Sequence, residues 1–293
     1  MSVDGLIVVD KPAGMTSHDV VARIRRLAKT RRVGHGGTLD PMATGVLIIG
    51  VNRATRLLTY VIGSGKSYAA TVRLGQSTVT DDAEGDVTAT VSAAGVEDAA
   101  IRAGLAVQRG EIDQVPSAVS AIKVNGERAY KRVRDGETVD LPPRRVTIAR
   151  LDVLEIRRQG DLVDVDIEVD CSSGTYIRAI ARDLGTGLGV GGHLTALRRT
   201  AVGRMTLGEA VTLEQLEERA PDVVSLTLAE AARQAFPERT ATADEAKVLS
   251  HGGPLEPVGI DGPYAVFDPA GEVLAIVSER AGRARAEIVL APA

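Results

Sequence analysis

The sequence predicts an α+β protein with a mixed, largely antiparallel sheet, flanking helices and a small β-rich C-terminal domain. Up to about residue 205, strand-like and helix-like segments are interspersed without the regular βαβ alternation of parallel-sheet proteins. Two β-rich runs, 146–157 and 162–170, are separated only by a short polar turn, which is typical of an antiparallel hairpin. Beyond Pro237 the chain changes to short β-like pieces divided by glycine and proline.

The first 50 residues predict two buried strands with an amphipathic helix between them. The runs 6–9 and 46–49 are short and wholly apolar, as in strands that are buried on both faces. Ser17 is a candidate N-cap, and apolar residues recur at helical spacing from Val20 to Ala28. The polar face of this helix and the residues directly after it form a basic cluster: Arg23, Arg25, Arg26, Lys29, Arg31 and Arg32.

This basic cluster is the first indication of a binding partner. Like charges at i,i+4, as at Arg25 and Lys29, destabilise a helix, and an anionic partner would explain them. Residues 1–66 contain ten Lys/Arg against four Asp/Glu, although the whole chain has a net charge of −4. The six side chains are therefore candidates for phosphate contacts with a nucleic acid, and a solvated charged surface is the alternative interpretation.

The remaining elements follow from periodicity and turn signals. Residues 68–74 predict a strand, and residues 97–107 predict a helix. Asn125-Gly126 follows a short apolar run and is a strong hairpin signal. An amphipathic helix is expected over 175–184, and the acidic stretch 209–235 predicts further helices.

Length and composition agree with two domains, which we place at residues 1–236 and 240–293. A chain of 293 residues exceeds the ~150 residues typical of one domain. No run approaches ~18 consecutive apolar residues, so no membrane span is predicted, and the N-terminus lacks the pattern of a signal peptide. The single cysteine, Cys171, leaves no intramolecular disulfide and fits a reducing compartment. We therefore expect a cytoplasmic protein.

Metal and nucleotide-cofactor sites are not predicted. The four histidines show no metal-binding spacing, and Cys171 has no cysteine partner. Residues 63–67 (GSGKS) are similar to the end of a phosphate-binding loop, but Tyr60 occupies the position of its first glycine. Residues 187–192 match G-x-G-x-x-G but follow a helix, whereas a dinucleotide site requires a preceding strand.

The most informative segment is 34–45, GHGGTLDPMATG. Three glycines before the Asp40-Pro41 step and another after it indicate a tight loop between two elements. On local chemistry alone, the better interpretation is a structural turn in which Asp40 acts as a cap.

The same segment resembles the G-x-LDP-x-A-x-G motif of the pseudouridine synthases, in which the aspartate is catalytic. The similarity is to the bacterial TruB type in particular, which acts on uridine 55 in the T loop of tRNA, and it extends over about residues 5–205. It implies the pseudouridine synthase fold, and the tail from about 240 more weakly resembles a PUA-type RNA-binding domain. The other matching segments are 5–17 (GLIVVDKPAGMTS), 66–68 (KSY), 74–76 (LGQ), Val115 to Lys123, 171–178 (CSSGTYIR) and 197–199 (LRR).

The resemblance implies a catalytic role for three residues. Asp40 would be the carboxylate nucleophile, attacking C6 of the pyrimidine or C1′ of the ribose, or assisting elimination to a glycal. A carboxylate has a reference pKa of about 3.9, and Arg178 would keep Asp40 ionised even when it is buried. Asp82 would orient Arg178. Tyr68 would stack on the target base and take part in removing the C5 proton.

Further residues are implied in binding the extruded nucleotide. Tyr176 and Leu197 would line the uracil pocket, and Lys11 would support the tyrosine or the wall of the site. His35 would occupy or brace the space that the extruded base vacates, since extrusion costs a few kcal/mol of unstacking.

The resemblance also implies partners. The substrate would be the T-arm stem-loop of tRNA, with no cofactor, because the isomerisation involves no net redox change. We expect a monomer that does not bind membranes. The alternatives are a tRNA-folding chaperone and a pseudouridine synthase that acts on another RNA.

Overall fold

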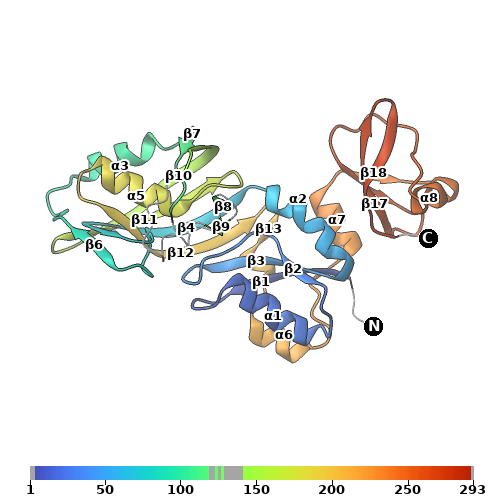
Figure 1. Cartoon of the computed structure of the whole chain (residues 1–293), viewed down its shortest axis with the longest axis horizontal. Helices are drawn as coiled ribbons and strands as arrows, with labels where there is room; N and C mark the ends of the chain where they lie inside the picture. The colour runs from blue at the N-terminus through green and yellow to red at the C-terminus, as the bar shows by residue number, and fades with distance from the viewer. Residues whose placement is uncertain (1–3, 119–122, 125–126, 129–140, 292–293) are drawn as a thin grey trace.

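The computed structural model describes residues 4–118, 123–124, 127–128 and 141–291. Within them, one ten-stranded sheet runs through the molecule, and a separate four-stranded sheet lies at one end (Figure 1). The large sheet has the order β14-β1-β3-β12-β4-β11-β10-β7, with β2 beside β3 and β13 beside β12. Every described pairing in it is antiparallel except β3 with β12. The predicted α+β class with a mixed, largely antiparallel sheet is therefore confirmed.

One half of the large sheet comes mainly from the N-terminal residues, and α1 and α6 lie against it in Figure 1. The apolar run 6–9 pairs residue by residue with 46–49, as two buried strands should. The elements of this half are β1 (Gly5–Lys11), α1 (Ser17–Leu27), β2 (Val33–His35), β3 (Thr44–Val51), α6 (Leu213–Arg219) and β14 (Leu226–Thr227).

The other half contains the predicted long hairpin, and α5 packs against two of its strands. Residues 66–74 alternate regularly between buried and half-buried side chains, the pattern of a strand with one face in the core. The elements are β4 (Lys66–Leu74), α3 (Asp98–Ala106), β7 (Gly110–Gln114), β10 (Arg144–Gln159), β11 (Leu162–Cys171), α5 (Ile177–Gly187), β12 (Gly192–Val202) and β13 (Met205–Thr206).

The two halves meet at the short parallel contact between β3 and β12, where Gly45 pairs with Arg199. Gly45 has φ +97°, and a Cβ there would lie 2.2 Å from the Arg199 carbonyl oxygen. Only glycine allows this approach of the two backbones. The junction places the loop between β2 and β3 directly beside β4 and β12.

The N-cap of α1 differs from the prediction. Thr16, not Ser17, is the N-cap: it accepts a hydrogen bond from the Asp19 amide, and the Asp19 carboxylate accepts one from the Thr16 amide, a capping box. The Ser17 hydroxyl instead accepts from the Leu39 amide at 2.9 Å and donates to the Leu39 carbonyl at 3.1 Å. Ser17 thus fastens the start of α1 to the residue before Asp40.

Smaller elements connect these halves. The strands on either side of the predicted 125–126 turn pair antiparallel, while Asn125 and Gly126 themselves lie outside the described residues. The α5 helix begins at Ile177, two residues after the predicted start, within the usual uncertainty of helix ends. The connecting elements are η1 (Asn52–Leu57), α2 (Leu58–Gly63), β5 (Gln76–Thr78), β6 (Val87–Thr90), β8 (Lys123–Val124), β9 (Glu127–Arg128) and η2 (Leu207–Glu209).

The C-terminal β-rich unit packs beside α2 and α7 (Figure 1). Phe267 and Ile276 belong to one apolar cluster with Leu57 and Leu58, so the contact is hydrophobic. The Tyr60 hydroxyl adds a 2.6 Å hydrogen bond to Glu287. The unit comprises β15 (Glu238–Thr240), α8 (Ala243–Ser250), β16 (Tyr264–Phe267), β17 (Val273–Arg280) and β18 (Arg283–Val289), and α7 (Leu228–Ala235) precedes it.

Candidate active site

A cavity of about 300 Å³ opens where the two halves of the large sheet meet. Its walls come from the loop between β2 and β3, the end of α2, strands β4 and β12, and the start of α5. The lining residues are Gly37, Thr38, Leu39, Asp40, Ile62, Lys66, Tyr68, Ser173, Gly174, Thr175, Tyr176, Ile177, Arg178, Leu197 and Arg199.

Asp40 lies in this cavity as part of a row of three charges. Its carboxylate is 3.1 Å from Nε of Arg178, and Nη1 of Arg178 is 3.4 Å from the carboxylate of Asp82. The Arg178 and Asp82 side chains are only 6% and 2% exposed, whereas Asp40 is 35% exposed to the cavity. A guanidinium between two carboxylates can orient the one that faces the open space.

Arg178 is held in place by the loop after β5. Its Nη1 donates to the Thr80 carbonyl oxygen at 2.8 Å. Asp82 is fixed in turn, because its Oδ1 accepts from the Thr80 hydroxyl at 2.5 Å and from the Glu84 amide at 3.0 Å. A buried charge costs little only when such partners are present.

Burial raises the pKa of Asp40 above its ordinary value, and Asp82 adds to this shift. Arg178, Lys11 and Arg199 oppose the rise but do not cancel it. The resemblance implies that Arg178 keeps Asp40 ionised even when it is buried. Desolvation in the cavity outweighs the cation instead.

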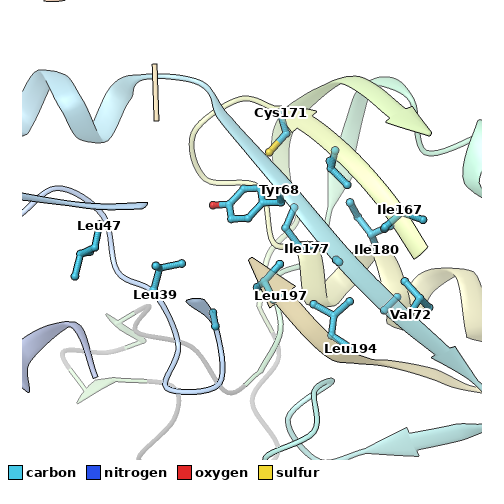
Figure 2. Close-up of a cluster of buried hydrophobic side chains, with 14 of the residues drawn as sticks. Leu39, Leu47, Tyr68, Val72, Ile167, Cys171, Ile177, Ile180, Leu194 and Leu197 are labelled. Atoms are coloured by element: carbon cyan, nitrogen blue, oxygen red, sulfur yellow. The ribbon is translucent and has the colours of Figure 1, made fainter. Parts of the chain in front are cut away.

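Tyr68 is 8% exposed and extends from β4 into the cavity. In Figure 2 its hydroxyl lies on the side of Leu39, whereas Val72, Ile167 and Leu194 cluster further along the strands. Burial raises the pKa of Tyr68, so the phenol is neutral at pH 7. Leu197, also 8% exposed, lines the cavity from β12.

Tyr176 lines the cavity from the residue directly before α5. Gln114 fixes its backbone from both sides: the Tyr176 amide donates to Oε1 at 2.8 Å, and its carbonyl accepts from Nε2 at 3.1 Å. The structure therefore gathers Asp40, Tyr68, Tyr176, Arg178 and Leu197 around one cavity, with Asp82 directly behind Arg178.

Lys11 is fully buried and does not line the cavity. Its Nζ donates to the carbonyl oxygens of Pro12 at 2.8 Å, Met15 at 2.6 Å and Pro41 at 3.2 Å. Lys11 was expected to support either the tyrosine or the wall of the site. Its contacts are with the wall, next to Asp40. Among the described residues, it forms no hydrogen bond with Tyr68.

His35 ends β2 outside the cavity lining. Its ring meets the His18 ring edge to face, with centroids 5.3 Å apart. Burial lowers the pKa of His35, and the nearby His18 lowers it further, so the ring is neutral at pH 7.

The basic cluster is divided between paired and exposed cations. Arg23 is ion-paired with Glu217 of α6, at 2.5 Å, so part of its charge is already compensated. Arg25 is exposed and donates to the Val33 carbonyl. The four remaining cations are exposed at the end of α1 and just beyond it: Arg26, Lys29, Arg31 and Arg32.

Arg199 and Lys66 are cavity residues to which sequence reasoning assigned no role. Arg199 is 1% exposed; its Nε donates to the Val46 carbonyl at 2.7 Å and its Nη2 to the Gly37 carbonyl at 3.1 Å. Both lie within segments that match the family, KSY and LRR, and this match is the feature of the sequence that could have indicated a role for them. Among the described residues, no group of three or more His, Cys, Asp or Glu side chains could hold a metal ion. No helix in the described part of the chain is long and apolar enough to span a membrane.

The fold is that of the pseudouridine synthases. A chain in the crystal structure of a Cbf5-Nop10-Gar1 complex superposes with a TM-score of 0.72 at 26% identity, covering 98% of this chain and 85% of that one. The solved archaeal box H/ACA sRNP Nop10-Cbf5 complex gives a TM-score of 0.71, also at 26% identity, covering 98% and 86%.

Family models extend the match to the sequence. Residues 25–177 match the N-terminal domain of TruB family pseudouridylate synthase, 178–223 the tRNA pseudouridylate synthase B C-terminal domain, and 236–291 the C-terminal part of tRNA pseudouridine synthase II. The tRNA pseudouridine synthase B of Arthrobacter sp. (strain FB24) is 57% identical, over 99% of this chain and 97% of the relative. That of Mycobacterium sp. (strain KMS) is 58% identical with the same coverage. The chain therefore belongs to the TruB family of pseudouridylate synthases, and it is an isomerase.

Proposed function

We propose that this pseudouridine synthase acts on tRNA, isomerising uridine 55 of the T loop with Asp40 as the nucleophile. The observation that carries the proposal is the Asp40 carboxylate, 3.1 Å from Arg178, facing a cavity that also holds Tyr68 and Leu197. Two relatives named tRNA pseudouridine synthase B are more than half identical to this chain over nearly their whole length, which supports tRNA as the substrate.

The reaction requires one ionised carboxylate and no redox partner. The N1–C1′ bond breaks, the uracil ring turns, and a C5–C1′ bond forms as the C5 proton leaves. Asp40 starts the reaction by attack at C6 or C1′, or by assisting elimination to a glycal, and all three routes need its anion. Arg178 orients that anion, and Asp82 holds Arg178 in place.

The cavity suits an extruded pyrimidine nucleotide. Tyr68 offers a ring for stacking, Tyr176 would enclose the base from the start of α5, and Leu197 would enclose it from β12. His35, neutral and half-buried on the segment leading to Asp40, would brace the RNA where the base has left the stack. Lys11 would keep the Asp40 loop rigid through its three carbonyl contacts.

Phosphate contacts are assigned to five members of the basic cluster along and after α1: Arg23, Arg26, Lys29, Arg31 and Arg32. The domain over 240–293 is a second candidate RNA-binding surface of the PUA kind, with 1–236 as the catalytic domain; the family match over 236–291 supports this division. The enzyme would work as a monomer in the cytoplasm on the T-arm stem-loop.

Release of tritium tests the assignment of Asp40. A T-arm stem-loop carrying tritium at uridine C5 should lose it to water with the wild-type enzyme. Asp40→Asn, of nearly the same shape, should bind the RNA and release no tritium above background, because it has no nucleophilic anion. Appreciable release by Asp40→Asn would remove the carboxylate from its role.

The same labelled stem-loop distinguishes the proposed function from two alternatives. A tRNA-folding chaperone would bind the stem-loop without catalytic turnover, so tritium release by the wild type contradicts a purely binding function. A synthase for another RNA would release tritium from a different substrate, and mapping pseudouridines in a deletion strain identifies which uridine is lost.

A further inference from the structure

The cavity wall holds more positive than negative charge. Its lining includes three cations, Lys66, Arg178 and Arg199, but only one carboxylate, that of Asp40. Arg178 is shared between Asp40 and Asp82. Within the described residues, neither Lys66 nor Arg199 forms an ion pair with a carboxylate. An electropositive wall in a cavity that is to receive an uncharged pyrimidine calls for an explanation.

Both cations donate hydrogen bonds to backbone carbonyls, and both lie beside Gly37. Nζ of Lys66 donates to the carbonyl oxygens of Ile62 at 3.0 Å and Ser64 at 2.8 Å, at the end of α2. Arg199 approaches from the other side, donating to the Gly37 carbonyl. A Cβ placed on Gly37 would lie 3.7 Å from Cε of Lys66 and 3.7 Å from Nη1 of Arg199. The two cations therefore converge at Gly37, three residues before Asp40.

Burying such cations without carboxylate partners costs free energy. Lys66 is 9% exposed and Arg199 is 1% exposed. An ammonium has three donors, and two of those of Lys66 are occupied by carbonyls. Burial of the two cations costs less free energy if negative charge appears in the cavity during the reaction, because a low local dielectric strengthens the attraction between the cations and that charge.

Uracil acquires negative charge by either route of attack. If Asp40 adds to C6, the electron pair of the C5=C6 bond moves through C5 onto O4. If the N1–C1′ bond breaks first, its electron pair stays on N1 and is shared with O2 and O4. In both cases the later C5–C1′ bond uses this electron pair, and the C5 proton leaves to solvent or to a base. The balance needs no oxidant or cofactor.

We propose that Lys66, with Arg199 behind it, stabilises the negative charge that develops on the uracil ring while the base is detached from the ribose. This inference rests on the proposed pseudouridine synthase function and adds Lys66 to its catalytic residues. Preorganised cations of this kind lower the barrier without tightening substrate binding. The competing explanation is a contact between Lys66 and a phosphate of the extruded nucleotide, which would tighten binding instead.

Substitution of Lys66 distinguishes the two. Lys66→Gln keeps a donor for the carbonyls of Ile62 and Ser64 but removes the charge. We expect the single-turnover rate constant on T-arm RNA to fall about 100-fold, with the RNA Kd and the melting temperature nearly unchanged. The exposed Arg102→Gln is the matched control and should behave as wild type. An unchanged rate, or a raised Kd with an unchanged rate, would overturn the proposal.

The pH dependence gives a second readout that a structural role would not produce. Burial and the neighbouring Arg199 lower the pKa of Lys66 to about 8. Its cation is therefore present below about pH 8 and lost above it, so the wild-type rate should decline from about pH 8 upward. The other groups facing Lys66 do not titrate there: burial raises the pKa of Cys171 to about 11 and also raises that of Tyr68, and Asp40 only becomes more ionised.

Lys66→Arg is the conservative variant, because a guanidinium stays charged throughout this range. It should recover much of the rate lost in Lys66→Gln and should not show the decline above pH 8. Any pH effect that comes from the RNA is the same for all variants, so it does not affect this comparison. A decline that persists in an active Lys66→Arg enzyme contradicts the role of the Lys66 charge. A wild-type enzyme that releases no tritium contradicts the proposed function itself, which is a different outcome.

Discussion

Two arginine–aspartate pairs in this protein share their chemistry and differ in their surroundings. Arg178 meets Asp40 in the cavity between the sheet halves, and Arg157 meets Asp166 on the exposed face of β10 and β11. Burial raises the pKa of Asp40 despite its arginine. Hydrogen bonds from Arg157, with a further one from Thr71, lower the pKa of Asp166.

Accessible area alone does not explain the difference. The Asp40 side chain is 35% exposed and the Asp166 side chain 28%, yet only Asp40 shows the pKa shift of a desolvated group. The open area of Asp40 faces the cavity, and the rest of its carboxylate is buried against the cavity wall with Asp82 behind the arginine. A carboxylate in such a place is weakly solvated, which suits a nucleophile. The pair of Arg157 and Asp166, outside the cavity, is a structural contact.

Removing each arginine should give the largest contrast. Arg178→Ala leaves Asp40 without its ion-pair partner and with only the more weakly acting Lys11 and Arg199 as nearby cations, so we expect turnover to fall by about 100-fold or more, with RNA affinity changed little. Arg157→Ala should leave turnover at the wild-type level, because its partner lies outside the cavity. Single-turnover tritium release and filter binding measure the two quantities; equal losses of turnover and affinity in Arg178→Ala would contradict the role of the pairing.

A smaller effect is expected from the exposed cations near α1. Arg26 forms no ion pair among the described residues, whereas Arg23 is paired with Glu217. Arg26→Gln should weaken RNA binding severalfold and reduce the slope of log K against log salt by about 1, with the bound-state rate unchanged. Arg23→Gln is the comparison and should change the slope less. A flat salt profile for the wild type would argue against a basic docking face.

The smallest effect concerns stability, with opposite signs at the two pairs. The folded-state pKa of Asp40 is raised, so its ionised form opposes folding at pH 7, and protonation favours the folded state as pH falls. The pKa of Asp166 is lowered, so its charge stabilises the fold at neutral pH and this is lost as pH falls. Asp40→Asn should therefore raise the melting temperature slightly at pH 7, and Asp166→Asn should lower it, each corresponding to under about 1 kcal/mol. Thermal unfolding at pH 7 and pH 4 measures both, and the same sign for both variants would contradict the comparison.

Local pattern was sufficient for much of the fold. The apolar runs 6–9 and 46–49 became β1 and β3, and the two β-rich runs became the hairpin β10–β11. The N-cap of α1 was placed one residue late, because Thr16 and Ser17 offer the same hydroxyl and the difference depends on the contact of Ser17 with Leu39. The strand order could not be read from pattern, since β3 and β12 are about 150 residues apart in sequence and their pairing depends on Gly45.

For the site, motif similarity identified Asp40, Tyr68, Tyr176, Arg178 and Leu197, and the structure places all five on one cavity. Motif similarity assigned no role to Lys66 and Arg199, because the sequence of a motif does not show whether a cation in it is solvated or buried. The direction of the Asp40 pKa shift was also out of reach, since desolvation depends on what surrounds the carboxylate in space.

The sequence by itself determined the α+β class and the family, and it singled out Asp40 as the candidate nucleophile, because these follow from periodicity and from short motifs that are local in the chain. Only the tertiary structure decided which cations share the cavity, how Lys11 supports its wall and how weakly Asp40 is solvated. These properties depend on distances between residues far apart in sequence, and electrostatic energies in a low-dielectric cavity change steeply with such distances.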